Sequence, residues 1–307
     1  MTAPNVTITD LTVTFRRGEV RALDGISLRL PVGMVGLLGP NGAGKTTFMR
    51  VLTGVLLPTA GTVAVDGTEL TSRSRRREVK SVIGYLPQEL GLYPDLTADQ
   101  FLDYMALLKG ITDRRARRAR VKEVLELVSL SDVASRKVKG YSGGMKRRVG
   151  IAQAVLNDPR LLIVDEPTVG LDPEERLRFR SLLARLAGDR TVLLSTHIVD
   201  DIVQTCPNVV VIERGHVAFQ GAVGDLATRA EDMVWHLTRP ATAPPPDLPT
   251  VNVTPGMTGT TYRVISSGTP APDAESVSAT VEDGYIALMH DTASERARRT
   301  GPTLHAV

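Results

Sequence analysis

The segment at residues 37–47 constrains the fold of this chain more than any other. The apolar run at residues 34–38 has the pattern of a buried strand, and residues 48–56 have the spacing of a helix. Residues 39–46, between them, match the phosphate-binding pattern G-x-x-x-x-G-K-[ST]. This phosphate loop consists of Gly39, Pro40, Asn41, Gly42, Ala43, Gly44, Lys45 and Thr46, and Thr47 follows it. A flexible glycine turn is the alternative, but the flanking strand and helix patterns favour a phosphate loop.

The residue types of the phosphate loop suit a nucleotide. Glycine lets backbone N–H groups curl around phosphate oxygens where a Cβ would block their approach. The helix that follows directs the partial positive charge of its N-terminus at the same phosphates. Lys45 can then reach the β- and γ-phosphates, and the hydroxyl of Thr46 can ligate Mg²⁺. The sequence therefore predicts a site for a nucleotide and Mg²⁺.

Composition limits the setting of this site. The 307 residues suffice for one large domain, alone or with an appendage, and 42% hydrophobic residues can form a sizeable core. A formal net charge of +3 is too small to indicate nucleic-acid binding by itself. The one cysteine, Cys206, excludes an internal disulfide and suits a reducing compartment. No signal-peptide pattern and no apolar run near ~18 residues is found, so we expect a cytosolic protein that can sit on a membrane through a partner.

Two further strand patterns end in residues that can do chemistry. The apolar run at residues 161–164 ends in Asp165 and Glu166, at the edge where open α/β sheets bind their ligands. There Asp165 would hold Mg²⁺, and Glu166 could polarise an attacking water. The strand pattern at residues 191–194 leads to His197. This side chain either hydrogen-bonds a γ-phosphate or simply neighbours a helix N-cap, and the residues alone favour neither.

Three weaker signals have competing interpretations. Phe15 lies where an adenine ring would need an aromatic platform, but taken alone it is better explained as a core residue of a strand. Gln88 follows the strand pattern at residues 82–86, where it could ligate Mg²⁺ or hold a water, although a single glutamine is usually a solvated loop residue. Arginines at positions 114, 115, 117, 118 and 120 could bind nucleic acid or anionic lipid, but a solvated helix face is favoured because no aromatic residues interleave.

The chain divides into regions of different character. Residues 5–38 are rich in strand patterns, and residues 91–158 read as inserted helices beginning near Thr97, Asp113 and Gly143. Pro173 is expected to begin another helix, with Leu177 among its apolar residues. We expect a main domain at residues 1–228 and a small α+β appendage at 229–307. The appendage holds a proline-rich loop at residues 239–250 and a frayed tail after Asp291.

A second anion-binding pattern begins the third inserted helix. Ser142 is followed by Gly143 and Gly144 at a predicted helix start. One nucleotide per chain does not need two such helix starts. The second one therefore suggests a contact with the nucleotide of another subunit.

Together these motifs make residues 5–225 resemble the ATPase of ATP-binding cassette (ABC) transporters. The matching segments occur in the family's order and are the Walker A loop at residues 39–46, the Q-loop at Gln88, the LSGGQ motif at residues 141–145, Walker B at residues 161–166, the D-loop at residues 170–172 ending in Asp172, the switch histidine at His197 and the adenine-stacking aromatic at Phe15. Tyr141 and Met145 replace the usual Leu and Gln of LSGGQ. This variant resembles bacterial ABC-2 exporters of the drug-resistance type, and residues 280–285 look like the appendage common in that subgroup.

The resemblance implies a fold and a partner arrangement. The fold would be a P-loop cassette with a mixed sheet core, an antiparallel N-terminal β-subdomain and an inserted helical subdomain. Two cassettes, identical or paired with a second cassette subunit, would close head to tail around two Mg-ATP. The phosphate loop of one and Ser142, Gly143 and Gly144 of the other would hold each γ-phosphate.

The resemblance also implies roles for individual residues. Glu166 would activate the attacking water, His197 would help to hold it, and Lys45 with Mg²⁺ would offset developing charge. The remaining nucleotide contacts would come from Phe15, Thr47, Gln88 and Asp172. The metal contacts would come from Thr46, Gln88 and Asp165. Gln88 and the inserted helices would relay closure to a separate transmembrane permease, with the chain at the cytoplasmic face of the membrane.

Two other classes compete with a transporter ATPase. An ABC ATPase acting on nucleic acid or ribosomes is suggested by the arginine runs. A second cassette or a long coiled coil, which such proteins usually carry, is not found in the sequence, and we expect no nucleic-acid partner. A cassette that binds but does not hydrolyse is disfavoured because Glu166 and His197 are both retained.

Overall fold

The computed structural model describes residues 6–69, 81–240, 242–257 and 259–299. The basic run expected at residues 73–80 lies outside them. Two compact units divide the chain, Met1–Val217 and Ala218–Val307. In the described ranges no helix is both long and apolar enough to cross a bilayer.

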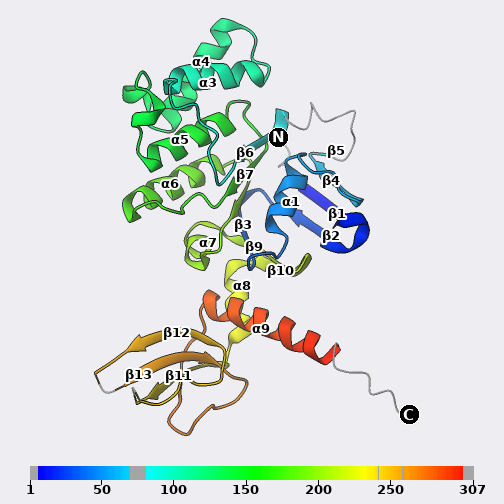
Figure 1. Cartoon of the computed structure of the whole chain (residues 1–307), viewed down its shortest axis with the longest axis vertical. Coiled ribbons are helices and arrows are strands. Elements are labelled where there is room, and N and C mark those ends of the chain that lie inside the picture. The colour runs from blue at the N-terminus through cyan, green and yellow to red at the C-terminus, as the bar shows by residue number, and fades with distance from the viewer. Residues whose placement is uncertain (1–5, 70–80, 241, 258, 300–307) are drawn as a thin grey trace. The chain divides into compact units, whose positions relative to one another are not determined.

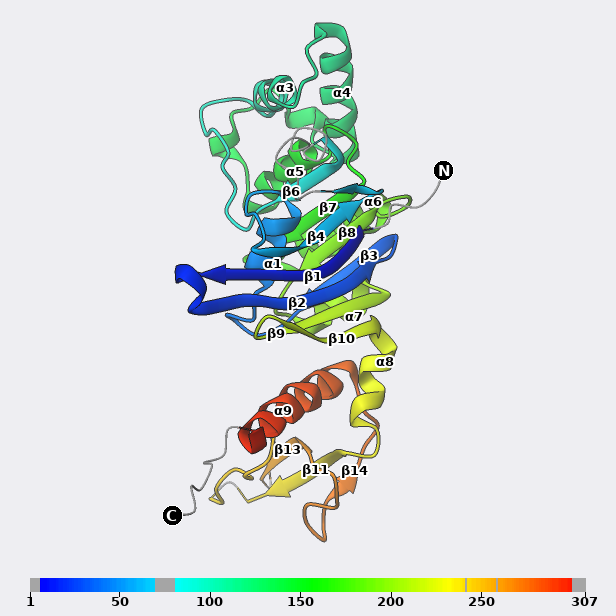
Figure 2. The same cartoon turned by 90° about the vertical axis from the view of Figure 1, so that its right-hand side faces the viewer.

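The first unit is built on two sheets (Figures 1 and 2). A four-stranded antiparallel sheet has the order β2-β1-β4-β5, and a six-stranded sheet has the order β10-β9-β3-β8-β7-β6. The strands of the first sheet are β1 (Val6–Phe15), β2 (Val20–Leu30), β4 (Ala60–Val65) and β5 (Thr68–Glu69). Those of the second are β3 (Gly33–Leu38), β6 (Ile83–Leu86), β7 (Leu161–Asp165), β8 (Thr191–Ser195), β9 (Asn208–Glu213) and β10 (His216–Ala222). The boundary between the two units falls within β10, after Val217. The expected mixed sheet and antiparallel β-subdomain are confirmed.

Alternation along β3 sets the layers around the larger sheet. Val35 and Leu37 join the core formed by helix α1 (Lys45–Leu52) and the antiparallel sheet. Gly36 faces the opposite side, where a Cβ would lie 2.6 Å from Ile202 of α7 (Val199–Thr205). Helix α6 (Pro173–Leu186) lies with α7 on the side of the sheet away from α1 (Figure 1). Pro173 begins α6 as expected, but Leu177 is 63% exposed because Phe179, Leu182, Leu183 and Leu186 form the buried stripe at helical spacing.

The inserted helices connect two neighbouring parallel strands, β6 and β7. They are α3 (Ala98–Leu108), α4 (Arg114–Leu127) and α5 (Gly143–Ala154), with short 3-10 turns η3 (Ser131–Val133) and η4 (Val138–Gly140). The helix starts predicted at Thr97 and Asp113 are confirmed. Thr97 forms a capping box with Gln100, and the Asp113 side chain accepts a hydrogen bond from the Ala116 N–H at 2.7 Å.

The second unit is a small α+β fold. Its antiparallel sheet has the order β12-β13-β11-β14, with β11 (Val234–Arg239), β12 (Thr250–Pro255), β13 (Thr260–Ile265) and β14 (Glu275–Ser276). Its helices are α8 (Val223–Ala227), the 3-10 turn η5 (Thr228–Ala230) and α9 (Val281–Arg299). The tail expected to fray after Asp291 is instead helical to Arg299, because the Ala, Glu and Arg residues there favour helix.

The unit boundary falls earlier than the expected division at residues 228/229. Helix α8 belongs with α9, against which it packs closely. A Cβ on Gly284 of α9 would lie 1.8 Å from the carbonyl oxygen of Leu226 in α8. This contact groups α8 with the C-terminal unit.

A buried ion pair holds α9 on the sheet of the C-terminal unit. Arg263 of β13 donates to both carboxylate oxygens of Asp283, at 2.8 and 2.7 Å, and the Asp283 side chain is fully buried. The Thr280 N–H and hydroxyl each donate to Asp283 Oδ2 at 2.6 Å. Burial by itself would raise the pKa of Asp283, but these hydrogen bonds outweigh it and hold the pKa below its ordinary value.

Replacing Asp283 with asparagine is expected to destabilise the C-terminal unit by about 3 kcal/mol, because Arg263 then lacks its counter-charge. Trp235, the single tryptophan, lies in β11 beside β13, so its fluorescence during denaturant unfolding reports on this unit. Asp291→Asn, on the same helix, is the control. Because the folded-state pKa is lowered, the wild-type contribution is present above the unfolded pKa of about 3.9 and is lost as pH falls further. An unchanged denaturant midpoint in Asp283→Asn would contradict a stabilising role for the Arg263–Asp283 ion pair.

Candidate nucleotide-binding and hydrolysis site

The phosphate loop joins β3 to α1 with backbone that only glycine adopts easily. Gly39 has φ of 151°, and a Cβ there would lie 2.1 Å from the Ile212 carbonyl oxygen. Gly44 caps α1 at φ of 108°, and a Cβ there would lie 2.6 Å from the Ala22 carbonyl oxygen. These contacts seat the loop against β9 and β2, leaving the N-terminus of α1 as an anion cradle.

Lys45 folds back across this loop. Its ammonium donates to the carbonyl oxygens of Gly39 at 2.5 Å and Pro40 at 3.1 Å. Burial lowers the pKa of Lys45, while the nearby carboxylates of Glu166 and Asp165 act in the opposite direction. The positive charge therefore lies between the loop and the ends of the strands, where it can meet the phosphates of a nucleotide.

Asp165 and Glu166 lie together at the end of β7. Asp165 is 9% exposed and pairs in register with Ser195 of β8. Burial raises the pKa of Asp165, and Glu166 adds to this, while Ser195, Lys45 and Arg147 oppose it. A cation at this carboxylate would therefore be favourable. Oxygen donors from Asp165, Thr46 and Gln88 suit Mg²⁺, which prefers such ligands together with phosphate oxygens.

Glu166 turns away from the strand in a left-handed conformation, with φ of 45°. Its N–H donates to the Ser195 carbonyl oxygen at 2.9 Å. One carboxylate oxygen, Oε2, is 2.9 Å from Nδ1 of His197, so the two side chains form a hydrogen-bonded pair. His197 precedes Ile198, the N-cap of α7, and its side chain is 59% exposed. The arrangement can orient Glu166 as an acceptor for a proton from water.

Phe15 and Gln88 lie on the surface of the first unit. Phe15 ends β1 and is 41% exposed, so the core interpretation is wrong. Adenine stacking on Phe15 stays a prediction. Gln88 follows β6, the neighbour of β7, and is exposed. The contact of Gln88 with Mg²⁺ or with a water also stays a prediction.

Arg147 is a residue that sequence reasoning did not assign to the site. Its guanidinium donates to the carbonyl oxygens of Gln88 at 3.1 Å and Val169 at 3.4 Å. Burial lowers its pKa, and Asp165 and Glu166 act in the opposite direction. Arg147 thus links α5 to the two loops that follow β6 and β7. The sequence places a basic residue shortly after Ser142 in the same helix, but this position alone does not predict hydrogen bonds to the loops at Gln88 and Val169.

Arg147→Met is expected to lower the turnover number about tenfold with little change in KM for ATP, because hydrogen bonds from a charged donor contribute about 1.5–3 kcal/mol. Phosphate release at saturating ATP measures this. Arg115→Met, which removes the same charge from α4, serves as the control. Equal turnover in both variants would rule out this role.

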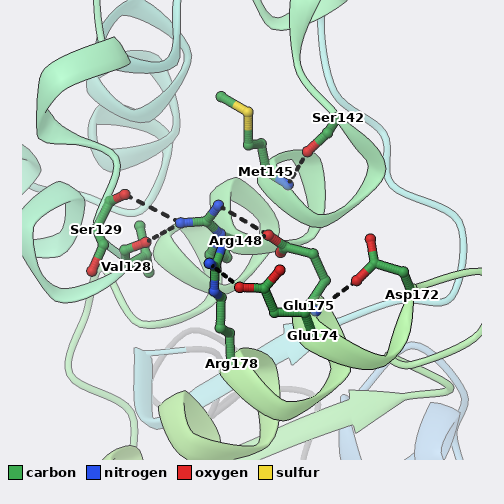
Figure 3. A network of polar contacts seen from close by, with 9 residues as sticks. All are labelled: Val128, Ser129, Ser142, Met145, Arg148, Asp172, Glu174, Glu175 and Arg178. Atoms are coloured by element: carbon green, nitrogen blue, oxygen red, sulfur yellow. Dashed lines mark hydrogen bonds and ion pairs between the residues drawn. The ribbon is translucent and has the colours of Figure 1, made fainter.

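The LSGGQ-like segment and the D-loop begin two neighbouring helices (Figure 3). The Ser142 hydroxyl accepts from the Met145 N–H at 3.2 Å, and Asp172 accepts from the Glu175 N–H at 2.8 Å. Tyr141 is buried and donates to the Val133 carbonyl oxygen at 2.7 Å, so its role is to pack the inserted region. Asp172 therefore has a local capping role besides the predicted nucleotide contact.

The structure gathers some predicted residues and leaves others apart. Lys45, Asp165, Glu166 and His197 come together at one edge of the sheet. Helix α5, with Ser142, belongs to the inserted helices and is separated from α1 by β6 and β7 (Figure 1).

Two residues of the arginine run on α4 make internal contacts. Arg117 donates to Asp103 at 2.8 Å, and Arg120 donates to the carbonyl oxygens of Leu156 at 2.8 Å and Val155 at 2.6 Å. These contacts tie α4 to α3 and to the end of α5, which leaves fewer free cations for an anionic polymer.

The fold and this edge of the sheet define a P-loop ATPase. The family model described as ABC transporter matches residues 10–169. The chain is 36% identical to ABC transporter ATP-binding protein NatA of Bacillus subtilis, over 74% of this chain and 94% of that one. It is 41% identical to Nod factor export ATP-binding protein I of Burkholderia orbicola, over 67% and 68%. The uncharacterized YxlF of Bacillus subtilis is 39% identical over 66% of each chain, just under two thirds of that relative's length.

Solved structures agree with this relationship. A dimeric ATP-binding cassette in a post-hydrolysis state, bound to ADP and Pi, superposes with a TM-score of 0.63 at 27% identity, over 71% of this chain and 98% of that one. The cbiO1 protein of Clostridium perfringens, part of the ABC transporter complex cbiONQ, superposes with a TM-score of 0.66 at 28% identity, over 72% and 89%. The chain belongs to the ABC transporter family, as an ATPase cassette that binds ATP with Mg²⁺.

Proposed function

We propose that this chain is the ATP-hydrolysing subunit of an ABC exporter and closes head to tail with a second cassette around two ATP molecules. The partner cassette is a second copy or a paired cassette subunit. The observation that carries the proposal is the separation of two helix starts whose sequences suit an anion, the phosphate loop at α1 and Ser142 at α5 (Figure 1). The dimeric solved relative supports it.

Different residues of the site bind the nucleotide, activate the water and stabilise charge during hydrolysis. The phosphate loop and Lys45 bind the phosphate chain, and Phe15 stacks on the adenine. Glu166 accepts the proton of the attacking water at its carboxylate, which His197 holds in position at 2.9 Å. Thr46, Asp165 and Gln88 would hold Mg²⁺, which would supply positive charge to offset the charge developing on the phosphates. Ser142, Gly143 and Gly144 of the partner cassette bind the γ-phosphate from the other side. Asp172 adds a further contact with the nucleotide.

A membrane permease is the second proposed partner, and it carries the membrane contact at the cytoplasmic face. The inserted region exposes apolar side chains on α3 and the preceding loop, namely Tyr93, Tyr104, Leu107 and Leu108. A cavity of about 400 Å³ is lined there by Tyr93, Pro94, Asp95, Leu96 and Tyr104. Exposed apolar surface of this kind is costly unless a partner covers it.

Purification of the complex from native membranes, with identification of the co-purifying membrane-spanning protein and transport assays on that complex, tests the exporter role. Leu108→Asp is expected to abolish co-purification because it places a charge in the apolar contact. Leu177→Asp, a similarly exposed leucine on α6, is the matched control, and thermal unfolding checks the fold of both. Retention of the permease by Leu108→Asp would contradict the proposed surface.

Drug or antibiotic efflux is the proposed transport task. The similarity to a Nod factor export protein supports an export direction, and the ABC-2-like Tyr141–Met145 variant supports the exporter subtype. Drug susceptibility of cells with and without the chain tests it. A role on nucleic acid or ribosomes is not favoured, because Arg117 and Arg120 are engaged within the inserted region.

A further inference from the structure

Glu175 lies where two helix starts of the proposed mechanism meet (Figure 3). It stands in the first turn of α6, and its N–H is capped by Asp172. A Cβ built on Gly144 would lie 2.1 Å from Oε2 of Glu175. The carboxylate therefore occupies the space that a side chain at position 144 would fill, directly against the first turn of α5.

Two arginines hold this carboxylate through its other oxygen. Oε1 is 3.2 Å from Arg178 Nη1 and 3.8 Å from Arg148 Nη2, whereas Oε2 is the oxygen that faces Gly144. The side chains of Arg148 and Glu175 are 17% and 18% exposed, so their charges are screened less than those on the surface.

The placement of Arg148 does not depend on Glu175 alone. Its Nη1 group donates to the carbonyl oxygens of Val128 at 3.3 Å and Ser129 at 3.2 Å, at the end of α4. These bonds would remain if the charge on Glu175 were removed. A change at Glu175 can therefore be made without releasing α5 from α4.

We propose that the Glu175 carboxylate weakens the binding of a phosphate group at the first turn of α5. The inference rests on the proposed function, in which this turn holds the γ-phosphate of the partner's ATP. A carboxylate beside a helix N-terminus opposes an incoming anion, because both compete for the same partial positive charge. Glu175 thereby makes the ATP-bound dimer easier to reopen.

The ATP concentration that gives half-maximal dimer tests this role. It is measured by sedimentation of the full chain in a Glu166→Gln background, so that ATP is not consumed. Glu175→Gln is expected to lower this concentration about threefold to tenfold, with a difference that shrinks as salt is raised. A purely structural role predicts the opposite, because loss of the ion pairs would loosen α5 from α6 and raise the concentration.

Matched variants separate charge from position. Glu174→Gln removes the same charge one residue away, from a side chain that is 75% exposed and pairs with Arg178 at 2.5 Å, and it should change nothing. Glu175→Asp keeps the charge, so its ATP concentration for half-maximal dimer should stay near that of the Glu166→Gln background. If Glu175→Gln unfolds normally on heating but its ATP concentration for half-maximal dimer is unchanged or higher, the inference alone is overturned. Absence of any ATP-dependent dimer, with either side chain at position 175, overturns the proposed function and this inference together.

Discussion

Replacing Glu166 with glutamine is expected to reduce ATP turnover at least about 100-fold while leaving ATP binding intact. General-base catalysis contributes about 10²–10⁴-fold, and a glutamine amide cannot take the proton from water. Glutamine has the same shape and can still hydrogen-bond Nδ1 of His197, which lies 2.9 Å from the carboxylate. The local geometry at the end of β7 should therefore persist.

The same variant is expected to accumulate as an ATP-bound dimer, because hydrolysis no longer reopens it. Single-turnover phosphate release, equilibrium ATP binding and sedimentation measure the three properties. Glu126→Gln, on the exposed side of α4, is the control for loss of a carboxylate. Undiminished hydrolysis by Glu166→Gln would remove Glu166 from the role of base.

Lys45→Ala is expected to weaken ATP binding at least about 30-fold, which corresponds to the ~2 kcal/mol typical of hydrogen bonds to charged groups. The ammonium lies across the phosphate loop, where it donates to the Gly39 and Pro40 carbonyl oxygens. Without it, the phosphates would face these carbonyl oxygens and the carboxylates of Asp165 and Glu166 with no lysine charge to offset them.

This binding defect distinguishes Lys45 from Glu166, whose replacement should spare binding. Titration calorimetry with ATP and Mg²⁺ measures it, and Lys122→Ala, on the solvent face of α4, is the control. Lys45→Arg should recover little, because a planar guanidinium does not fit the space of an ammonium in the loop. Wild-type affinity in Lys45→Ala would exclude the proposed phosphate contact.

Local features followed directly from the order of residues. The phosphate loop, the buried strand that ends at Asp165, and the helix starts at Thr97, Asp113 and Pro173 lie where their patterns predicted. Each depends on neighbours within a few positions: glycine spacing, an apolar run, or a capping side chain that reaches its own helix. The fold class followed as well, because the cassette motifs occur in a fixed order along the chain.

The local order of residues is therefore enough to predict the class of site and its backbone conformation, whereas tertiary packing brings the side chains of the site together. Phe15 proved exposed, Tyr141 buried and Leu177 solvent-facing, since each depends on what packs against its element. The Glu166–His197 pair, the links from Arg147 to the loops after β6 and β7, and the contact of Glu175 with Gly144 join segments far apart in the chain. No local pattern encodes such contacts, because they exist only after the strands have aligned and the inserted helices have packed onto α6.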